Sequence, residues 1–226
     1  MKSRIGLKLL YVTVIISLLY GIEQILVSSF GIKALLKILL LCLIPVALGY
    51  VHKDGIKSLF SFKQTNWERS KISLWLASGV FALIIGAYAV LASYIDTVSI
   101  LLTLKENTGV NAGNFWYIGL YIIFGNSFIE EYFFRGYLVL QEQSQNMRNI
   151  MLYVSAAIFA FYHVTILDGW FSWYIFILIF AGIFVGGLLF SWLNAKGKSL
   201  YNGWIMHAGA DLAIVVIGFW LFYGPK

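Results

Sequence analysis

Apolar runs of about 20 residues follow one another along almost the whole chain. A helix that crosses a membrane needs about 20 mostly apolar residues. In lipid every backbone polar group must be paired internally, so such runs form helices. The sequence therefore predicts an all-α fold, a polytopic transmembrane helical bundle of about seven to eight spans, and about seven can be delimited: Leu7–Phe30, Ala34–Val51, Ile72–Ile95, Phe115–Leu140, Ile150–Leu167, Trp173–Leu193 and Gly203–Phe222.

Composition agrees with this fold class. Only 12% of the 226 residues are charged, about half the share of a soluble domain. Little sequence is left between the runs, so we expect one membrane-embedded domain over residues 1–226. The first run follows three basic residues, as a signal peptide does. It is longer than a typical signal core and no small-x-small cleavage motif follows, so we expect it to be retained as the first span.

The basic residues follow the alternation of the loops. They precede the first span, separate the second from the third, and separate the sixth from the seventh: Lys2, Arg4, Lys8, Lys53, Lys57, Lys63, Arg69, Lys71, Lys196 and Lys198. The positive-inside rule makes this side, with the N-terminus, cytoplasmic, and it places the connection from Asp96 to Asn114 outside. The net charge of +6 is thus a topology signal. It indicates a lipid bilayer as partner and no nucleic acid.

Ionisable groups within the spans gather in three segments of the second half of the chain. The first is "NSFIEEYFFRG". Glu131 and Arg135 are four residues apart, so they share a helix face and can pair. Glu130 is rotated by about 100° from Glu131. It has no counter-charge in its own helix, so it must find one across the bundle or take up a proton.

The other two segments are "FAFYHVT" and "NGWIMHAGADL". They contribute the intramembrane histidines His163 and His207, and Asp211 shares a helix face with His207. Three helices can thus direct an acid or an imidazole at one interior point. Glu130 with an imidazole can activate a water molecule, and a second His with an Asp can bind the oxyanion or the leaving group. This set indicates peptide hydrolysis.

Other interpretations of the same residues stay open. The Glu131–Arg135 pair can be a structural salt bridge, and a histidine in a span can serve as a hydrogen bond between helices. Chains of Glu, His and Asp also form the proton relays of membrane transporters. A proton-coupled transporter is therefore the first alternative function.

The three segments together resemble a known family. "EEYFFR" is similar to the EExxxR motif of the CAAX-protease and bacteriocin-processing (CPBP, Abi) family of intramembrane endopeptidases. "FAFYH" matches its FxxxH motif, and "HAGAD" matches its third motif, a His followed four residues later by Asn or Asp. The resemblance covers roughly residues 115–222, which is the expected catalytic core.

The resemblance implies an endopeptidase whose site lies in an interior cavity open to one side. Glu130 and His163 would polarise the attacking water, His207 and Asp211 would stabilise the tetrahedral intermediate, and Glu131 and Arg135 would shape the first motif. The substrate would be a peptide or a membrane-associated protein, cut in CAAX-type, bacteriocin or signal-peptide processing. We expect an integral protein of the bacterial plasma membrane. A non-catalytic bacteriocin-immunity protein is the second alternative.

The sequence leaves the role of a metal open. Glu130, His163 and His207 are a ligand set usual for catalytic zinc, and both metal-dependent and metal-free glutamate mechanisms have been put forward for the family. We favour a metal-free site, because a metal-bound Glu130 would leave the general base to Glu131, which pairs with Arg135. Ionised Asp211 cannot donate to an oxyanion. It must be protonated, orient His207, or help to bind a cation.

Two geometric expectations can be checked directly. By the predicted boundaries, His207 lies near the cytoplasmic end of its span and His163 near the outer end of its own. At 1.5 Å per residue their depths differ by about 10 Å, which tilted helices or a fifth span that begins deeper must remove. The four-residue spacing of Gly182 and Gly186 predicts a close helix approach there. Cys42, in apolar surroundings, is predicted to be a packing residue.

Overall fold

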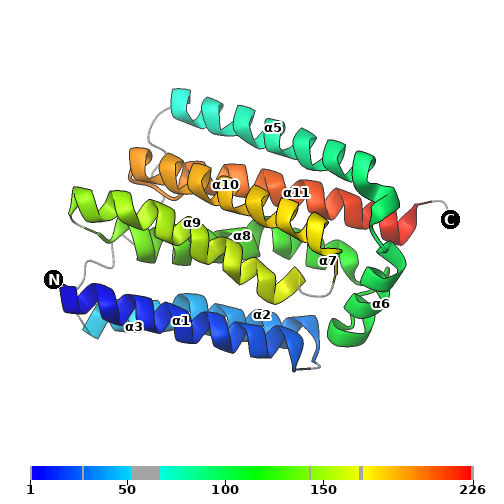
Figure 1. Ribbon diagram of the computed structural model, residues 1–226, viewed down its shortest axis with the longest axis horizontal. Helices are drawn as coiled ribbons and strands as arrows, with labels where there is room; N and C mark the ends of the chain where they lie inside the picture. The colour runs from blue at the N-terminus through cyan, green and yellow to red at the C-terminus, as the bar shows by residue number, and fades with distance from the viewer. Residues whose placement is uncertain (1, 27, 52–66, 143, 168–169, 225–226) are drawn as a thin grey trace.

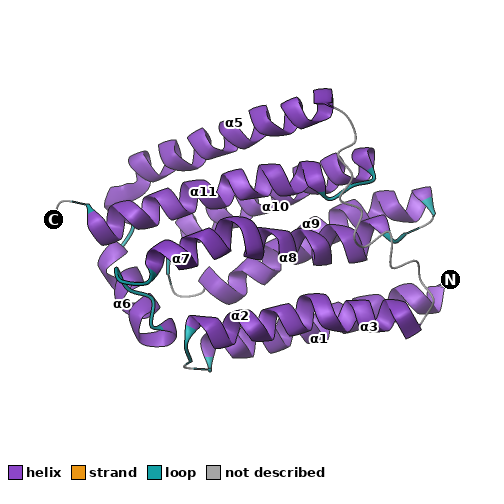
Figure 2. Cartoon of the chain, turned by 180° about the vertical axis from the view of Figure 1, so that it is seen from behind, coloured by secondary structure: helices purple, strands orange, loops and turns teal. Residues whose placement is uncertain are grey.

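The structure is a computed structural model that describes residues 2–26, 28–51, 67–142, 144–167 and 170–224. Within these residues every regular element is a helix (Figures 1 and 2), so the all-α prediction is confirmed. The α-helices are α1 (Lys2–Gln24), α2 (Phe30–Ile38), α3 (Ile44–Val51), α5 (Trp67–Leu91), α6 (Thr97–Thr108), α7 (Phe115–Leu120), α8 (Ser127–Glu131), α9 (Gln145–Leu167), α10 (Trp173–Gly197) and α11 (Tyr201–Tyr223). Short π- and 3₁₀-helical segments join some of them: η1 (Leu39–Leu43), η2 (Ala92–Tyr94), η3 (Tyr121–Asn126) and η4 (Tyr132–Leu140).

Five helical segments of the described chain are long and apolar enough to cross a membrane. They are Gly6–Gln24, Phe30–Ala47, Trp67–Tyr94, Trp173–Gly197 and Tyr201–Tyr223. The segments predicted as the fourth and fifth spans are also helical but do not belong to this group. The fourth is divided among α7, η3, α8 and η4 and carries three charged residues. The protein is an integral membrane protein.

The first predicted span extends too far. The first span was expected to reach Phe30, but α1 ends at Gln24 and Phe30 begins α2, because Ser29 adopts an extended conformation at the N-cap. The connection from Asp96 to Asn114 contains the helix α6. Its N-cap is Asp96, whose carboxylate accepts a hydrogen bond from Ser99 N at 3.0 Å, as an Asp in that position commonly does.

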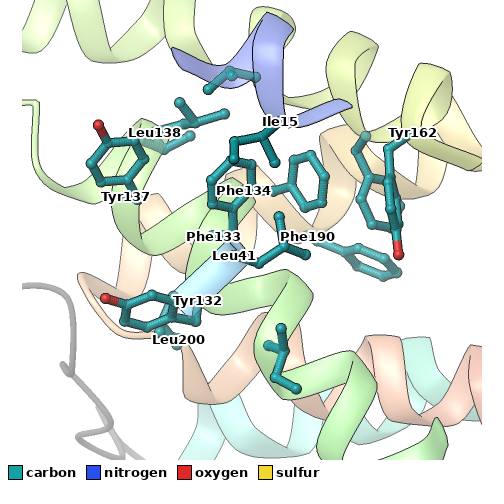
Figure 3. Close-up of a cluster of buried hydrophobic side chains, with 14 of the residues drawn as sticks. Ile15, Leu41, Tyr132, Phe133, Phe134, Tyr137, Leu138, Tyr162, Phe190 and Leu200 are labelled. Atoms are coloured by element: carbon teal, nitrogen blue, oxygen red, sulfur yellow. The ribbon is translucent and has the colours of Figure 1, made fainter. Parts of the chain in front are cut away.

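The segment from α8 to η4 forms the centre of the bundle. Every residue of η4 from Tyr132 to Val139 is buried. α9 and α10 pack around it, and Tyr11 of α1 contacts the ring of Tyr137. α1 with α2 and α3 forms one outer face, and α5, packed on α11, forms the opposite one (Figure 1). The buried side chains of Phe133, Phe134 and their neighbours fill the space between these helices (Figure 3). Cys42 packs half-buried against this core, as predicted.

The outer surface suits lipid rather than water. Trp75, Leu83 and Val90 of α5 are 78%, 70% and 75% exposed. Exposed large apolar side chains over a whole helix face would favour aggregation of a soluble protein. In a bilayer they contact acyl chains at no such cost.

Basic residues gather at one end of the bundle. The N-terminal ends of α1 and α5 and the C-terminal end of α10 lie at the same end (Figure 1). Arg69 Nη1 donates a hydrogen bond to the carbonyl of Lys196 at 2.7 Å across that end. This is the arrangement that the alternating basic loops predict. Lys53, Lys57 and Lys63 lie outside the described residues.

Helices approach closely at glycines other than the predicted pair. A Cβ on Gly182 would meet nothing within 4 Å, and one on Gly186 only the ring of Phe190 at 3.9 Å, so that prediction is wrong. The close approaches are at Gly187, where a Cβ would lie 3.2 Å from Ala156 Cα, and at Gly209, where it would lie 3.1 Å from Ala77 Cα. These contacts join α10 to α9 and α11 to α5.

Candidate active site

The two acidic residues of the first motif reach the same imidazole. They lie on α8, a single α-helical stretch between the π-helical segments η3 and η4, and π-helical turns are frequent at functional sites. Glu131 Oε1 lies 3.1 Å from His207 Nδ1, and Glu130 Oε2 lies 3.6 Å from His207 Nε2. Glu130, Glu131 and His207 are 1%, 0% and 4% exposed. α8 and α11 thus place two carboxylates and an imidazole in a buried cluster.

Glu131 is held from three sides. Arg135 Nη1 lies 2.9 Å from Glu131 Oε1, so the predicted pair within the helix is confirmed. Asn194 Nδ2 donates to Glu131 Oε2 at 2.7 Å, while its Oδ1 accepts from Gly203 N at 2.7 Å. With its carboxylate fixed in this way, Glu131 accepts a hydrogen bond from His207 Nδ1 and thereby sets the tautomer of that ring.

Arg135 is fully buried and has further partners. It donates from Nη2 to the carbonyl of Gly187 at 3.2 Å, and its guanidinium lies over the ring of Phe159 at 4.2 Å. A buried guanidinium needs most of its donors satisfied. These contacts join η4 to α9 and α10.

Glu130 finds its counter-charge across the bundle, as the sequence required. Its Oε1 accepts hydrogen bonds from Asn126 Nδ2 at 2.8 Å and Tyr162 OH at 3.1 Å, and Lys37 Nζ lies 3.8 Å away. Its other oxygen, Oε2, is buried and has no hydrogen-bond partner among the described residues. One oxygen is thus fixed by donors, while the other faces His207.

Four residues of this network were not predicted as site residues: Lys37, Asn126, Tyr162 and Asn194. Lys37 carried a signal, because an ionisable residue within an apolar run is a functional candidate by default. Tyr162 precedes a motif histidine, and Asn194 follows a predicted span. The positions of Tyr162 and Asn194 in the sequence do not distinguish a site residue from a residue that only packs between helices.

His163 contacts the ring of Phe159, which in turn contacts His207 of the acidic cluster. Its Nδ1 is 2.8 Å from the carbonyl of Phe159. Because a carbonyl only accepts, Nδ1 carries the proton, and Nε2 of the neutral ring holds the lone pair. The ring contacts Phe159 at 4.5 Å and Tyr162 at 5.2 Å between centroids. It lies within electrostatic range of Glu130, but no hydrogen bond joins the two in the described structure.

The expected difference in depth between the histidines does not occur. The ring of Phe159 contacts both His163 and His207, at centroid distances of 4.5 and 5.5 Å. α9 extends farther than α11 towards the basic end of the bundle (Figure 1). This offset brings a residue late in α9 level with one early in α11. The helix of the fifth predicted span thus begins nearer the basic end than expected, at Gln145, and not deeper in the bundle.

Asp211 lies at the edge of the cluster. Its Oδ1 is 3.8 Å from His207 Nε2, and the side chain is 17% exposed. Its Oδ2 has no hydrogen-bond partner among the described residues. Asp211 therefore does not bond the nitrogen that Glu131 holds. Asp211 and Glu130 both lie near Nε2, the other ring nitrogen of His207.

The donor set does not fit a three-ligand metal site. Among the described residues no group of three His, Cys, Asp or Glu side chains is arranged to hold a metal ion. The ammonium of Lys37, 3.8 Å from Glu130 Oε1, also opposes a second cation there, because like charges at such a distance repel strongly in a buried site.

Two apolar grooves lie on the outer surface, away from these residues. One of about 640 Å³ is lined by Trp116, Trp220 and Tyr223 with their neighbours, and one of about 370 Å³ by Leu120, Ile123, Leu212 and others. Both lie along α7 and α11, and the second also includes Ile123 of η3. Neither is lined by an ionisable residue of the site.

The comparison with protein families agrees with the motifs. Residues 112–213 match the model of a family described as type II CAAX prenyl endopeptidase, Rce1-like. No curated protein and no solved structure shows a significant match to the chain. The matched residues include all three motifs, from Glu130 to Asp211. The expected family resemblance is thus confirmed over residues 112–213, which match the Rce1-like CAAX protease family.

Proposed function

We propose that the protein is an intramembrane endopeptidase that cleaves a peptide or a membrane-associated protein with a water molecule activated by Glu130 and His163. One observation carries the proposal: carboxylate oxygens without hydrogen-bond partners, Glu130 Oε2 and Asp211 Oδ2, belong to the two acids that flank Nε2 of His207. Buried acceptors of this kind are suited to bind a water molecule. The match to a protease family supports hydrolysis as the use of that water.

The proposed chemistry assigns each proton to an atom. Water attacks the carbonyl carbon of the scissile bond while one of its protons passes to Glu130 Oε2, and Nε2 of His163 accepts a hydrogen bond from the same water. Protonated Nε2 of His207 donates to the oxyanion. When the C–N bond breaks, Glu130 returns its proton to the leaving amine.

The bond from Glu131 to His207 Nδ1 supports a positioning role for Glu131 and Arg135. With Nδ1 engaged at 3.1 Å, His207 can direct only Nε2 at a substrate. Asp211, on the other side of Nε2, would stabilise the imidazolium form of the ring. This is a role that an ionised carboxylate can perform, and it removes the need for Asp211 to donate a hydrogen bond.

A pair of matched carboxylates tests the proposal. Glu130→Gln should abolish cleavage of prenylated and unprenylated peptides by protein in lipid nanodiscs, with a loss of at least about 10³-fold, because the amide cannot take the proton of water. Glu23→Gln is the control, since Glu23 is also an acid in a membrane helix and lies 3.4 Å from a lysine, Lys33. It should retain most activity.

The outcomes separate the alternatives. Cleavage that survives in both Glu130→Gln and His163→Ala would contradict the mechanism. Proton-dependent flux in proteoliposomes without any cleavage would indicate a transporter. Protection against a bacteriocin that persists in Glu130→Gln would indicate a non-catalytic immunity protein.

We further propose that the basic end of the bundle faces the cytoplasm of a bacterial cell. The positive-inside rule supports this orientation, and the contact between Arg69 and Lys196 supports a common side for these residues. The substrate would then reach the site within the plasma membrane.

A further inference from the structure

We propose that Lys37 is a positioning residue of the hydrolytic site, which fixes Asn126 and, through it, the carboxylate of Glu130. The inference rests on the proposed function, because it assigns a role within that site. Lys37 belongs to α2, outside the residues 112–213 that match the protease family. The N-terminal helices would therefore complete the site as well as cover it.

The contacts of Lys37 fix the orientation of one amide. Its side chain is buried, and Nζ donates to Asn126 Oδ1 at 3.0 Å. An ammonium group only donates, so it selects the oxygen of the amide. The Nδ2 of Asn126 is then left to donate to Glu130 Oε1, at 2.8 Å. Without Lys37 the amide can rotate and present its oxygen to the carboxylate, which would repel it.

The same contacts decide which oxygen of Glu130 reacts. Oε1 accepts from Asn126 and Tyr162 and lies 3.8 Å from the Lys37 ammonium. These donors occupy its lone pairs, so the proton of water must go to Oε2. The direction of Oε2 towards His207 is thereby fixed before substrate binds, as an efficient general base requires.

Lys37 is also the cation that balances Glu130. The other charged or titratable groups around Glu130 are Glu131 and Arg135 of its own helical segment, Tyr121 of η3, Tyr162 and His163 of α9, and His207 and Asp211 of α11. Arg135 is paired with Glu131 at 2.9 Å. A buried carboxylate that loses its cation tends to take up a proton, and a protonated Glu130 cannot act as a base.

Lys33 provides a matched control one turn away. It is also a buried lysine of α2, 4% exposed against 9% for Lys37. Its Nζ contacts Glu23 Oε2 at 3.4 Å and the Glu23 carbonyl at 3.0 Å. The two lysines thus share residue type, helix and burial, and differ in the carboxylate that they contact.

The test compares kcat and KM of Lys37→Met, Lys37→Arg and Lys33→Met in nanodiscs. Lys37→Met should lower kcat on the order of 10- to 100-fold, the usual effect of removing a residue that orients a reacting group, and leave KM near the wild-type value. Lys37→Arg should recover most of the loss, since a guanidinium also donates to an amide oxygen. Lys33→Met should keep the wild-type kcat. Equal losses in the two Met variants, a loss confined to KM, or no loss would overturn the proposal.

A second readout does not need a substrate. Infrared spectra at neutral pH should show a protonated carboxylic acid in Lys37→Met that is absent from the wild type and from Lys33→Met, and that disappears in Lys37→Met/Glu130→Gln. If Lys37→Met does not fold, Lys37→Gln replaces it, because it removes the charge and keeps a hydrogen-bond donor. A wild type that cleaves nothing would end the proposed function alone, whereas a missing infrared band would end the role of Lys37.

Discussion

The two ring nitrogens of His207 have different partners. Its ring stacks on Phe190, with centroids 4.9 Å apart and planes inclined by 15°, so its two nitrogens point in fixed directions. Nδ1 is held by Glu131, and Nε2 lies 3.6 Å from Glu130 and 3.8 Å from Asp211. Rotation of the ring would break the stacking and the hydrogen bond together.

The buried ion pair behind His207 gives a prediction for stability. Arg135→Met should lower the free energy of unfolding by about 3–5 kcal/mol, because it leaves Glu131 charged and unpaired in the protein interior. Thermal unfolding in detergent measures the change. Lys71→Met is the control. It removes an exposed pair with Glu68 at 3.0 Å, with side chains 45% and 74% exposed, and such pairs contribute about 0.2–1 kcal/mol. Equal shifts in the two variants would contradict a structural role for Arg135.

At the scale of residues, the motifs could be predicted and their supports could not. Glu131 and Arg135 pair because a helix places residues four apart on one face, which spacing alone reveals. Asn194 holds Glu131 from α10, and Lys37 holds Asn126 from α2. Contacts between helices depend on rotation and offset, which no local pattern in the chain specifies.

The close packing of α5 on α11 depends on small residues. A Cβ on Gly209 would lie 3.1 Å from both Cα and the carbonyl oxygen of Ala77, and 2.7 Å from its Cβ. Small residues allow membrane helices to approach closely. Gly209 lies between His207 and Asp211 in the sequence. Its contact with Ala77 therefore fixes the part of α11 that carries both residues.

This contact predicts opposite effects of two glycine substitutions. Gly209→Ala should separate α5 from α11 and destabilise the protein by about 1–3 kcal/mol, the usual range for overpacking. Gly79→Ala on α5 should be neutral or stabilise by up to about 1 kcal/mol, because its Cβ would meet nothing within 4 Å and Ala has the higher helix propensity. The measurement is thermal unfolding in nanodiscs. A Gly209→Ala variant as stable as Gly79→Ala would exclude this packing.

The sequence predicts the presence of a helix better than it predicts where that helix begins, ends or changes its hydrogen-bonding pattern. Length and hydrophobicity indicated α10 and α11 to within a few residues. The span that carries the first motif was predicted to be one continuous helix, whereas the structure divides this span among α7, η3, α8 and η4. A π-helical turn shifts the backbone hydrogen bonds by one residue, and it is stabilised by packing around η4 rather than by its own composition.

On the scale of the whole molecule, charge and helix direction agree. α1 and α5 begin, and α10 ends, at the basic end, while α6 lies at the opposite end (Figure 1). Long apolar helices bring these ends to the two membrane surfaces. The proposed orientation therefore makes different residues accessible from each side of the cell membrane.

Cysteine labelling tests that orientation. In a Cys42→Ser background, which removes the only cysteine, Asn111→Cys should react with a membrane-impermeant maleimide on intact cells. Glu68→Cys should react only after the cells are opened, because it lies on the basic end beside Arg69. Both positions are exposed. The reverse pattern would invert the proposed topology and leave the active-site geometry unaffected.

The sequence by itself determined the membrane class, the helical content and the three motifs that match the protease family. Hydrophobic length and helical spacing are local properties, and ionisable residues in lipid are too costly to be there without a use. Only the tertiary structure decided that Glu130 turns one oxygen towards His207 while Lys37, Asn126 and Tyr162 surround the other. That choice depends on how four helical segments rotate and slide against one another, which is set by side-chain packing between them and not by the order of residues along any one.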